Sequence, residues 1–139
     1  MPKTGSSTKL LLLDTHVLVW IFFDPGRLSK KAEQAIDDAR NQGTGIFLSD
    51  VTLFEVASLV ARKRLELQVS LESFLEEVES RFTVLPVNRH VAARSVQLPS
   101  TYPKDPMDRI IGATALVEGC PLVTADESIR RAKVVKTIW

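Results

Sequence analysis

The sequence predicts one α/β domain with a mostly parallel central sheet of four to five strands flanked by helices. Short, continuous apolar runs, which are typical of strands buried on both faces, alternate with segments of helical periodicity. Strands that alternate with helices in this way form parallel sheets with helices packed on their faces. The chain has 139 residues, 45% of them hydrophobic, which suits a single buried core.

Four apolar runs and a shorter fifth mark the expected strands. Leu10–Leu13 is the first, and Asp14 ends it. The others are residues 45–48, 83–87 and 121–124, with Val134–Val135 as a short fifth strand. Residues 1–8 contain Pro, Gly, Ser and Thr without periodicity, so we expect a flexible N-terminal extension before a domain of residues 9–139.

Helical spacing of apolar residues fills the intervals between these runs. A helix is expected over Thr15–Phe22, directly after the first strand. Amphipathic patterns follow at residues 32–39, 53–60 and 71–78, with a weaker one at residues 88–98. Residues 107–118 are apolar nearly all the way round, which predicts a buried helix that ends at Gly119.

Charge and cysteine content exclude several classes of protein. With 18 Lys and Arg against 17 Asp and Glu, the formal net charge is +1, which excludes binding of a polyanion by bulk charge. Cys120 is the only cysteine, which excludes an internal disulfide and a cysteine-based zinc site and agrees with a reducing compartment. The run Leu10–Leu13 is far shorter than the ~20 residues of a membrane span. We therefore expect a cytoplasmic protein with no membrane partner.

Acidic residues lie where the expected strands end and the next helices begin. They are Asp14, Glu55, Asp105, Asp108 and Asp126. Ligands of open α/β sheets bind outside the carboxyl ends of the strands, so these acids are candidate functional residues.

Each acid also has a purely structural explanation, which stays open at this point. Asp14 and Asp126 could each cap a helix. The segment Thr52–Glu55 has the form of a capping box. The segment Asp105–Asp108 places an N-cap acid before Pro106 and a second acid in the first helical turn, where the helix dipole favours an anion.

The apolar surroundings of two acids favour a chemical role. Glu55 shares a helical stripe with Val51 and Leu59, and Asp108 shares one with apolar residues of the buried helix. An ionised carboxylate that is buried without a partner costs several kcal/mol, so these acids need a cation. Arg109 is nearby, but its spacing would let it pair with Asp105 on the helix surface.

Clustered carboxylates without cysteine are the ligand set that Mg²⁺ or Mn²⁺ prefers. Such clusters serve hydrolysis of phosphodiesters by a metal-activated water, with no protein nucleophile. Ser49 and Thr52 lie at the same rim and could orient a carboxylate, a water or a phosphate, or simply cap the helix. The glycine-rich phosphate-binding motifs and the G-x-S-x-G motif are absent from the sequence, which disfavours nucleotide-binding folds and serine hydrolases.

Four segments resemble the motifs of PIN-domain ribonucleases, and in particular of VapC-type toxins. They are LLLLDTHVLVW at residues 10–20, SDVTLFEVA at 49–57, DPMDRIIGATA at 105–115 and LVTAD at 122–126. They occur in the family's order and with roughly its spacing. Three positions differ from the usual pattern, because Met107 and Phe54 replace a common Phe and Trp, and Pro103 stands where relatives often carry a histidine.

The resemblance implies a single PIN-like domain with Mg²⁺- or Mn²⁺-dependent endoribonuclease activity. Asp14, Glu55 and Asp108 would form the principal acidic set that holds the metal, with Asp126 as the fourth acid; Asp105 and Thr124 would support them. The family also implies a homodimer and a small VapB-like antitoxin whose tail covers the acidic pocket. A non-catalytic PIN-like binding module and a related metal-dependent DNA nuclease remain the alternatives.

Small clusters of basic residues would have to bind the RNA, because the net charge of the whole chain is near zero. The candidates are the run Arg62–Lys63–Arg64, the group Arg27, Lys30 and Lys31, and the group Arg130, Arg131 and Lys133. Aromatic residues are few, and no stacking platform is predicted. His16, beside Asp14, is expected to pack or to support the acid rather than to shuttle protons.

Overall fold

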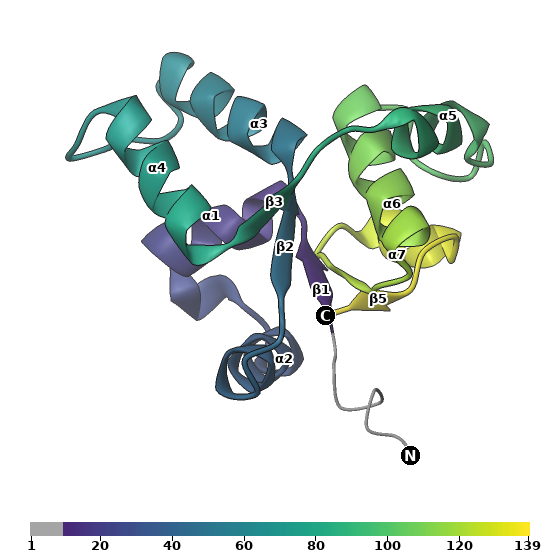
Figure 1. Ribbon diagram of the computed structural model, residues 1–139, viewed down its shortest axis with the longest axis horizontal. Helices are drawn as coiled ribbons and strands as arrows, with labels where there is room; N and C mark the ends of the chain where they lie inside the picture. Colours follow the sequence, from purple (N-terminus) through teal and green to yellow (C-terminus); the bar gives the residue numbers. More distant parts are fainter. Residues whose placement is uncertain (1–9) are drawn as a thin grey trace.

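Five parallel strands form the centre of the molecule in the computed structural model, which describes residues 10–139 (Figure 1). The strands are β1 (Leu11–Leu13), β2 (Ile46–Ser49), β3 (Thr83–Leu85), β4 (Leu122–Val123) and β5 (Thr137–Ile138). Their order across the sheet is β3-β2-β1-β4-β5, and all four neighbouring pairs are parallel. The predicted α/β class is therefore confirmed. The extension predicted for residues 1–8 lies outside the described residues.

The position predicted for the fifth strand is wrong. Val134–Val135 follows Lys133, whose left-handed backbone (φ 54°) ends the last helix. The chain is still returning to the sheet at this point, and the Val135 side chain is buried in the core instead of belonging to a strand. Pairing starts only later, where the Leu122 amide donates to the carbonyl of Lys136 at 2.8 Å.

Helices connect the strands where the periodicity predicts them. They are α1 (Thr15–Phe23), α2 (Lys30–Asn41), α3 (Asp50–Ala61), α4 (Leu71–Arg81), α5 (Arg89–Gln97), α6 (Pro106–Glu118) and α7 (Glu127–Ala132), with a short 3-10 turn η2 (Pro25–Arg27). Gly119 ends α6 in the left-handed conformation at φ 66°, as predicted. None of the helices in residues 10–139 is long and apolar enough to cross a membrane.

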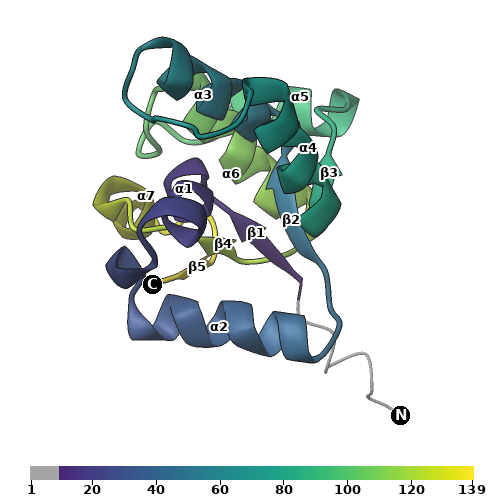
Figure 2. The same cartoon turned by 90° about the vertical axis from the view of Figure 1, so that its left-hand side faces the viewer.

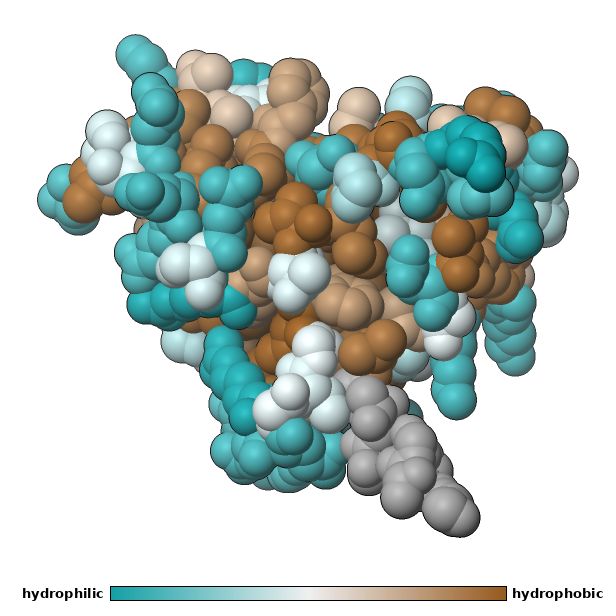
Figure 3. Space-filling model, viewed as in Figure 1, coloured by the Kyte–Doolittle hydropathy of each residue, from teal (hydrophilic) through white to brown (hydrophobic). Residues whose placement is uncertain are grey.

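The helices form two groups, one on each face of the sheet (Figure 1). Leu11 and Leu13 of β1 pack with residues of α1 to α4, whereas Leu12 packs with residues of α6 and α7. This division follows from the alternation of side chains along a strand. Figure 3 shows apolar side chains gathered between the two groups of helices, with hydrophilic side chains to either side.

The carboxyl ends of the strands meet at one edge of the sheet, from which α1 and α3 begin. Figure 2 shows α2 running along the opposite edge, below the strands. Helix α3 begins directly after β2, and its N-cap is Ser49, whose hydroxyl accepts from the Val51 amide at 3.3 Å. The capping box predicted for Thr52–Glu55 is therefore wrong, because the helix starts earlier and both residues lie inside it.

Candidate active site

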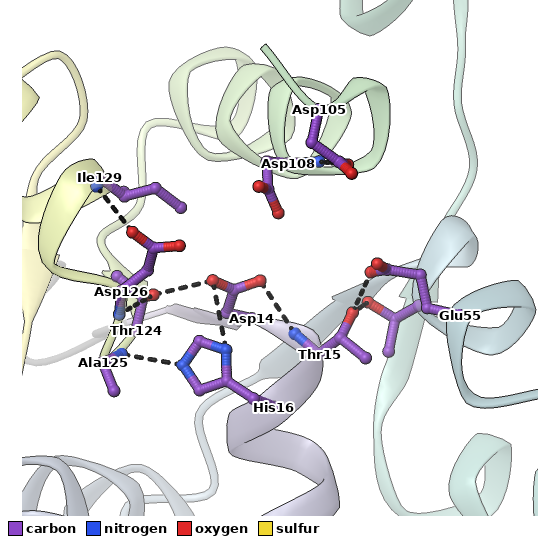
Figure 4. A network of polar contacts seen from close by, with 11 residues as sticks. Asp14, Thr15, His16, Glu55, Asp105, Asp108, Thr124, Ala125, Asp126 and Ile129 are labelled. Carbon is purple, nitrogen blue, oxygen red and sulfur yellow. Dashed lines mark hydrogen bonds and ion pairs between the residues drawn. The ribbon is translucent and has the colours of Figure 1, made fainter. Parts of the chain in front are cut away.

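Asp14 lies at the end of β1 and is only 4% exposed. Its Oδ1 accepts from the amide of Thr15 at 3.0 Å, which is its contact as the N-cap of α1. Its Oδ2 accepts from the hydroxyl of Thr124 at 2.7 Å, a residue that directly follows β4 (Figure 4). Two adjacent parallel strands thus fix the orientation of this carboxylate, and its capping role accounts for only one of its oxygens.

Asp126 is placed beside Asp14 by the same threonine. The Thr124 hydroxyl accepts from the Asp126 amide at 3.0 Å, and Oδ1 of Asp126 accepts from the Ile129 amide at 3.1 Å, so this acid also caps α7. The second oxygen of Asp126 lies on the side of Asp14 and Asp108 (Figure 4). Thr124 therefore orients two acids at once.

Glu55 enters from α3 and is held by hydroxyl groups. The Thr15 hydroxyl donates to Oε1 of Glu55 and lies 3.0 Å from the hydroxyl of Thr52. Burial raises the pKa of Glu55, as do the nearby charges of Asp14 and Asp105, whereas the bond from Thr15 lowers it. Thr52 thus contributes to this network. Thr15 was not among the predicted site residues, because a threonine that follows a capping Asp forms no distinctive sequence pattern. Its role becomes visible only when α3 is placed against α1.

Asp108 lies in the first turn of α6, and its pKa is raised to about 7. Burial is the largest cause, and the remaining causes are the charges of four acids: Asp14, Asp105, Asp126 and Glu55. The four charges that raise this pKa are thus all negative. The acids that the sequence singled out lie within electrostatic reach of Asp108.

Asp105 and Arg109 have other contacts. Asp105 is exposed and caps α6, because its Oδ1 accepts from the amides of Met107 at 2.8 Å and Asp108 at 3.1 Å. The Asp105–Arg109 pair that the spacing allows does not form, because the Arg109 guanidinium is bonded elsewhere. It donates to the carbonyl of Ser95 in α5 and to three carbonyls of the α5–α6 connection, those of Leu98, Tyr102 and Pro103.

Tyr102 lies near the acidic side chains of the site and is 1% exposed. Within residues 10–139 its hydroxyl has no hydrogen-bond partner. Burial raises its pKa, as do the charges of Asp14, Asp108 and Asp126. The ring packs on Gly112 of α6, where an added Cβ would lie 2.6 Å from the Tyr102 Cζ atom, so only glycine fits at this position.

His16 supports the loop after β4. Its Nε2 accepts from the amide of Ala125 at 2.9 Å, which assigns the ring proton to Nδ1, and Nδ1 lies 3.7 Å from Oδ2 of Asp14. Burial lowers the pKa of His16, although the charges of Asp14 and Asp126 raise it in part. A neutral ring with both nitrogens directed at protein groups agrees with the expected supporting role.

A cavity of about 290 Å³ opens between α1, α3 and α6. Its lining combines carboxylates and a hydroxyl with apolar side chains: Asp14, Thr15, His16, Val19, Trp20, Glu55, Leu59 and Asp108. In the described part of the chain no three acidic, histidine or cysteine side chains are close enough together to hold one ion. The carboxylates surround a common space (Figure 4).

The run Arg62–Lys63–Arg64 is divided between two places. Arg62 is close enough to Glu55 for its charge to lower the pKa of that acid. Lys63 and Arg64 line a separate cavity between the end of α3 and the start of α4. Arg62 is therefore the member of this run that lies nearest the acids.

Comparison with known proteins agrees with this fold. The PIN domain family model matches residues 11–135. Ribonuclease VapC22 of Mycobacterium tuberculosis (strain ATCC 25618 / H37Rv) is 36% identical over 131 residues, which cover 93% of this chain and 98% of that protein.

Two solved structures share the fold. VapBC2 from Rickettsia felis bound to a DNA fragment from its promoter superposes with a TM-score of 0.69 at 15% identity, over 92% of this chain and 96% of that chain. A toxin–antitoxin complex from Klebsiella pneumoniae gives a TM-score of 0.66 at 23% identity, over 93% of this chain and 96% of that chain.

Proposed function

The chain belongs to the PIN domain family, and we propose that it is a metal-dependent endoribonuclease that acts as the toxin of a type II toxin–antitoxin pair. Its 36% identity to a VapC ribonuclease over nearly the whole length of both proteins supports the activity. The observation that carries the proposal is the convergence of Asp14, Glu55, Asp108 and Asp126 on one space at the carboxyl edge of a parallel sheet.

The donor set suits a hard divalent cation. All four groups offer oxygen atoms, which Mg²⁺ and Mn²⁺ prefer. The pKa of Asp108 is raised chiefly by burial and then by the charges of the other acids, whose repulsion a cation would relieve. We infer that these four carboxylates would hold Mg²⁺ or Mn²⁺ partly through water, since Mg²⁺ keeps several waters and contacts only one or two carboxylates directly. A bound ion of this kind supplies Lewis-acid stabilisation of charge at the scissile phosphate and makes water more acidic.

The surrounding residues prepare the acids for this role. Thr124 and the Thr15 amide fix the two oxygens of Asp14, so that this carboxylate needs little reorganisation when substrate arrives. Thr15 donates to Glu55 at the other side of the cavity, and the hydroxyl of Thr52 contacts that of Thr15. His16 is neutral and bonded to Ala125, so it orients the loop that carries Asp126. None of these residues needs to act as a nucleophile, because water is the attacking group in the proposed hydrolysis.

The same comparisons support a proposal for the partner. The solved structures that share this fold include VapBC and other toxin–antitoxin complexes. We propose a VapB-like antitoxin as the partner of this chain and a homodimer as its assembly. Co-expression with the product of a neighbouring reading frame tests the first part, and the mass of the purified protein in solution tests the second.

RNA cleavage by the purified protein tests the activity. We expect cleavage that needs Mg²⁺ or Mn²⁺ and that Asp14→Asn abolishes while the fold is kept, because Asn caps a helix as well as Asp does. Asp37→Asn is the matched control, since Asp37 is exposed on α2 at the far edge of the sheet. Undiminished cleavage by Asp14→Asn would exclude the proposed site.

Cation binding tests the alternative of a non-catalytic binding module. A cation that binds only the folded state must raise the melting temperature. We therefore expect millimolar Mn²⁺ to stabilise the wild-type protein and to stabilise Asp14→Asn less. If Mn²⁺ leaves the melting temperature of the wild-type protein unchanged, the four acids do not form a cation site.

A further inference from the structure

Trp20 forms part of the wall of the acidic cavity. It lies on α1 one helical turn beyond His16, and it lines the same cavity as Asp14, Glu55 and Asp108. The sequence predicted no stacking platform, but the structure places this indole at the rim. The four-residue spacing of His16 and Trp20 accounts for this, because it puts both rings on the stripe of α1 that faces the carboxyl edge of the sheet.

Three groups hold the indole in one orientation. The guanidinium carbon of Arg27 lies 4.2 Å from the centre of the Trp20 ring, in a cation–π contact. The His16 ring lies 5.0 Å from Trp20 at 58°, and the Trp139 ring lies 5.7 Å away at 56°. Both rings meet the indole at a tilt, so neither is stacked flat on it. An aromatic side chain that is fixed before binding loses little conformational entropy when a ligand arrives.

Positive charge lies on both sides of the acids. Arg27 is exposed, and it is close enough to His16 for its charge to lower the pKa of that ring. Arg62 lies near Glu55 on the α3 side. An unpaired nucleic-acid strand is bound through aromatic rings that stack on bases and cations that contact phosphates, and both occur at Trp20.

We propose that an unpaired base of the RNA substrate stacks on the face of Trp20 opposite Arg27, next to the phosphate that is cleaved, and that Arg27 contacts a flanking phosphate. The proposal rests on the ribonuclease activity proposed above and deepens it, because it makes Trp20 the residue that positions an unpaired base of the substrate. A duplex cannot present a free base face to this indole while its bases remain stacked.

Fluorescence tests the stacking without any need for cleavage. The chain has two tryptophans, so Trp139→Phe leaves Trp20 as the only indole, and Asp14→Asn in the same protein prevents cleavage during the titration. We expect a short random-sequence RNA oligonucleotide to quench the fluorescence of Trp20 and an abasic oligonucleotide of the same length to quench it far less. Equal quenching by both, or none by either, would overturn the proposal.

Kinetics test whether the stacked base positions the substrate. Trp20→Leu keeps an apolar side chain but removes the aromatic face, and we expect its KM for unpaired RNA to rise roughly tenfold with a smaller change in kcat. Trp20→Phe should recover most of this loss. Phe54→Leu is the matched control, because Phe54 is 64% exposed on α3 and does not line the cavity, so its KM should not change. Melting temperatures of all three variants verify that they fold.

The two experiments separate this proposal from the proposed activity. If the wild-type protein cleaves no RNA, the activity is wrong, whereas the quenching experiment still decides whether Trp20 stacks on bases. If the wild-type protein cleaves RNA and Trp20→Leu cleaves it with the same KM and at the same positions, the role of Trp20 is wrong and the activity stands.

Discussion

Replacing Asp108 by Asn should make the cation-free protein more stable at neutral pH. The folded protein raises the pKa of this carboxyl from its ordinary value of 3.8 to about 7, chiefly through burial and then through four neighbouring acids. The folded state therefore holds the proton more tightly than the unfolded state does. Below pH 4 Asp108 is protonated in both states, and it costs the folded state no stability. As pH rises from about 4 to 7 the folded state loses stability, and above pH 7 the loss has reached its full size.

The size of the effect follows from the same values. Each tenfold change in proton affinity corresponds to about 1.4 kcal/mol, so the rise of the Asp108 pKa from 3.8 to about 7 sets an upper limit of about 4 kcal/mol. The side chain is partly exposed, and solvent screening reduces the effect to roughly 1–2 kcal/mol. Loss of the favourable interaction with the dipole of α6 takes away a few tenths of a kcal/mol. The net gain corresponds to an increase of about 3–6 °C in melting temperature.

Thermal unfolding in EDTA measures this gain. We expect Asp108→Asn to melt above the wild-type protein at pH 8, and the difference to shrink at pH 5. Asp105→Asn is the comparison at the start of the same helix: Asp105 is exposed and Asn serves equally as an N-cap, so we expect only the smaller gain that comes from removing one of the charges acting on Asp108. A difference that does not grow with pH, or an equal gain from Asp105→Asn, would refute the electrostatic reasoning.

Two further predictions concern the supports of the site. Thr124→Val leaves Oδ2 of Asp14 and the amide of Asp126 without their shared partner. We therefore expect a loss of about 1–3 kcal/mol in the free energy of unfolding and at least a roughly tenfold slower cleavage of RNA. Thr124→Ser should retain both stability and activity, and a valine variant as active as wild type would contradict this. Arg109→Met removes the donors of four carbonyls and should cost about 2–4 kcal/mol in urea unfolding, whereas Arg131→Met breaks only an exposed pair with Glu127 and should change stability by less than about 0.5 kcal/mol.

Much of the fold could be predicted because local patterns and tertiary structure agree in this chain. Leu11–Leu13 is apolar at every position and lies in the sheet centre, where both faces of a strand are covered. Gly119 ends α6 because its left-handed backbone suits glycine. Val134–Val135 misled the prediction, because burial and strand pairing both favour β-branched residues and only the tertiary structure distinguishes them.

The acids and two of their supports, Thr52 and Thr124, could be found from the sequence, but Thr15 and the contacts of Arg109 could not. Asp14, Asp108 and Asp126 stand at element boundaries, which periodicity locates well. Thr15 contacts Glu55 across two helices, and Arg109 reaches carbonyls in a loop without regular structure. Such contacts depend on how elements pack, and no spacing along the chain encodes them.

The bond between Thr124 and Asp14 joins residues that lie 110 positions apart. The acidic site is therefore incomplete until β4 has paired with β1, and β4 is among the last elements of the chain to be synthesised. A growing chain on the ribosome that has exposed β1 to α6 carries Asp14, Glu55 and Asp108 but lacks both the hydroxyl that orients the first acid and the fourth carboxylate. The order of strands in the sheet thus makes assembly of the proposed site depend on pairing between strands that lie far apart in the sequence.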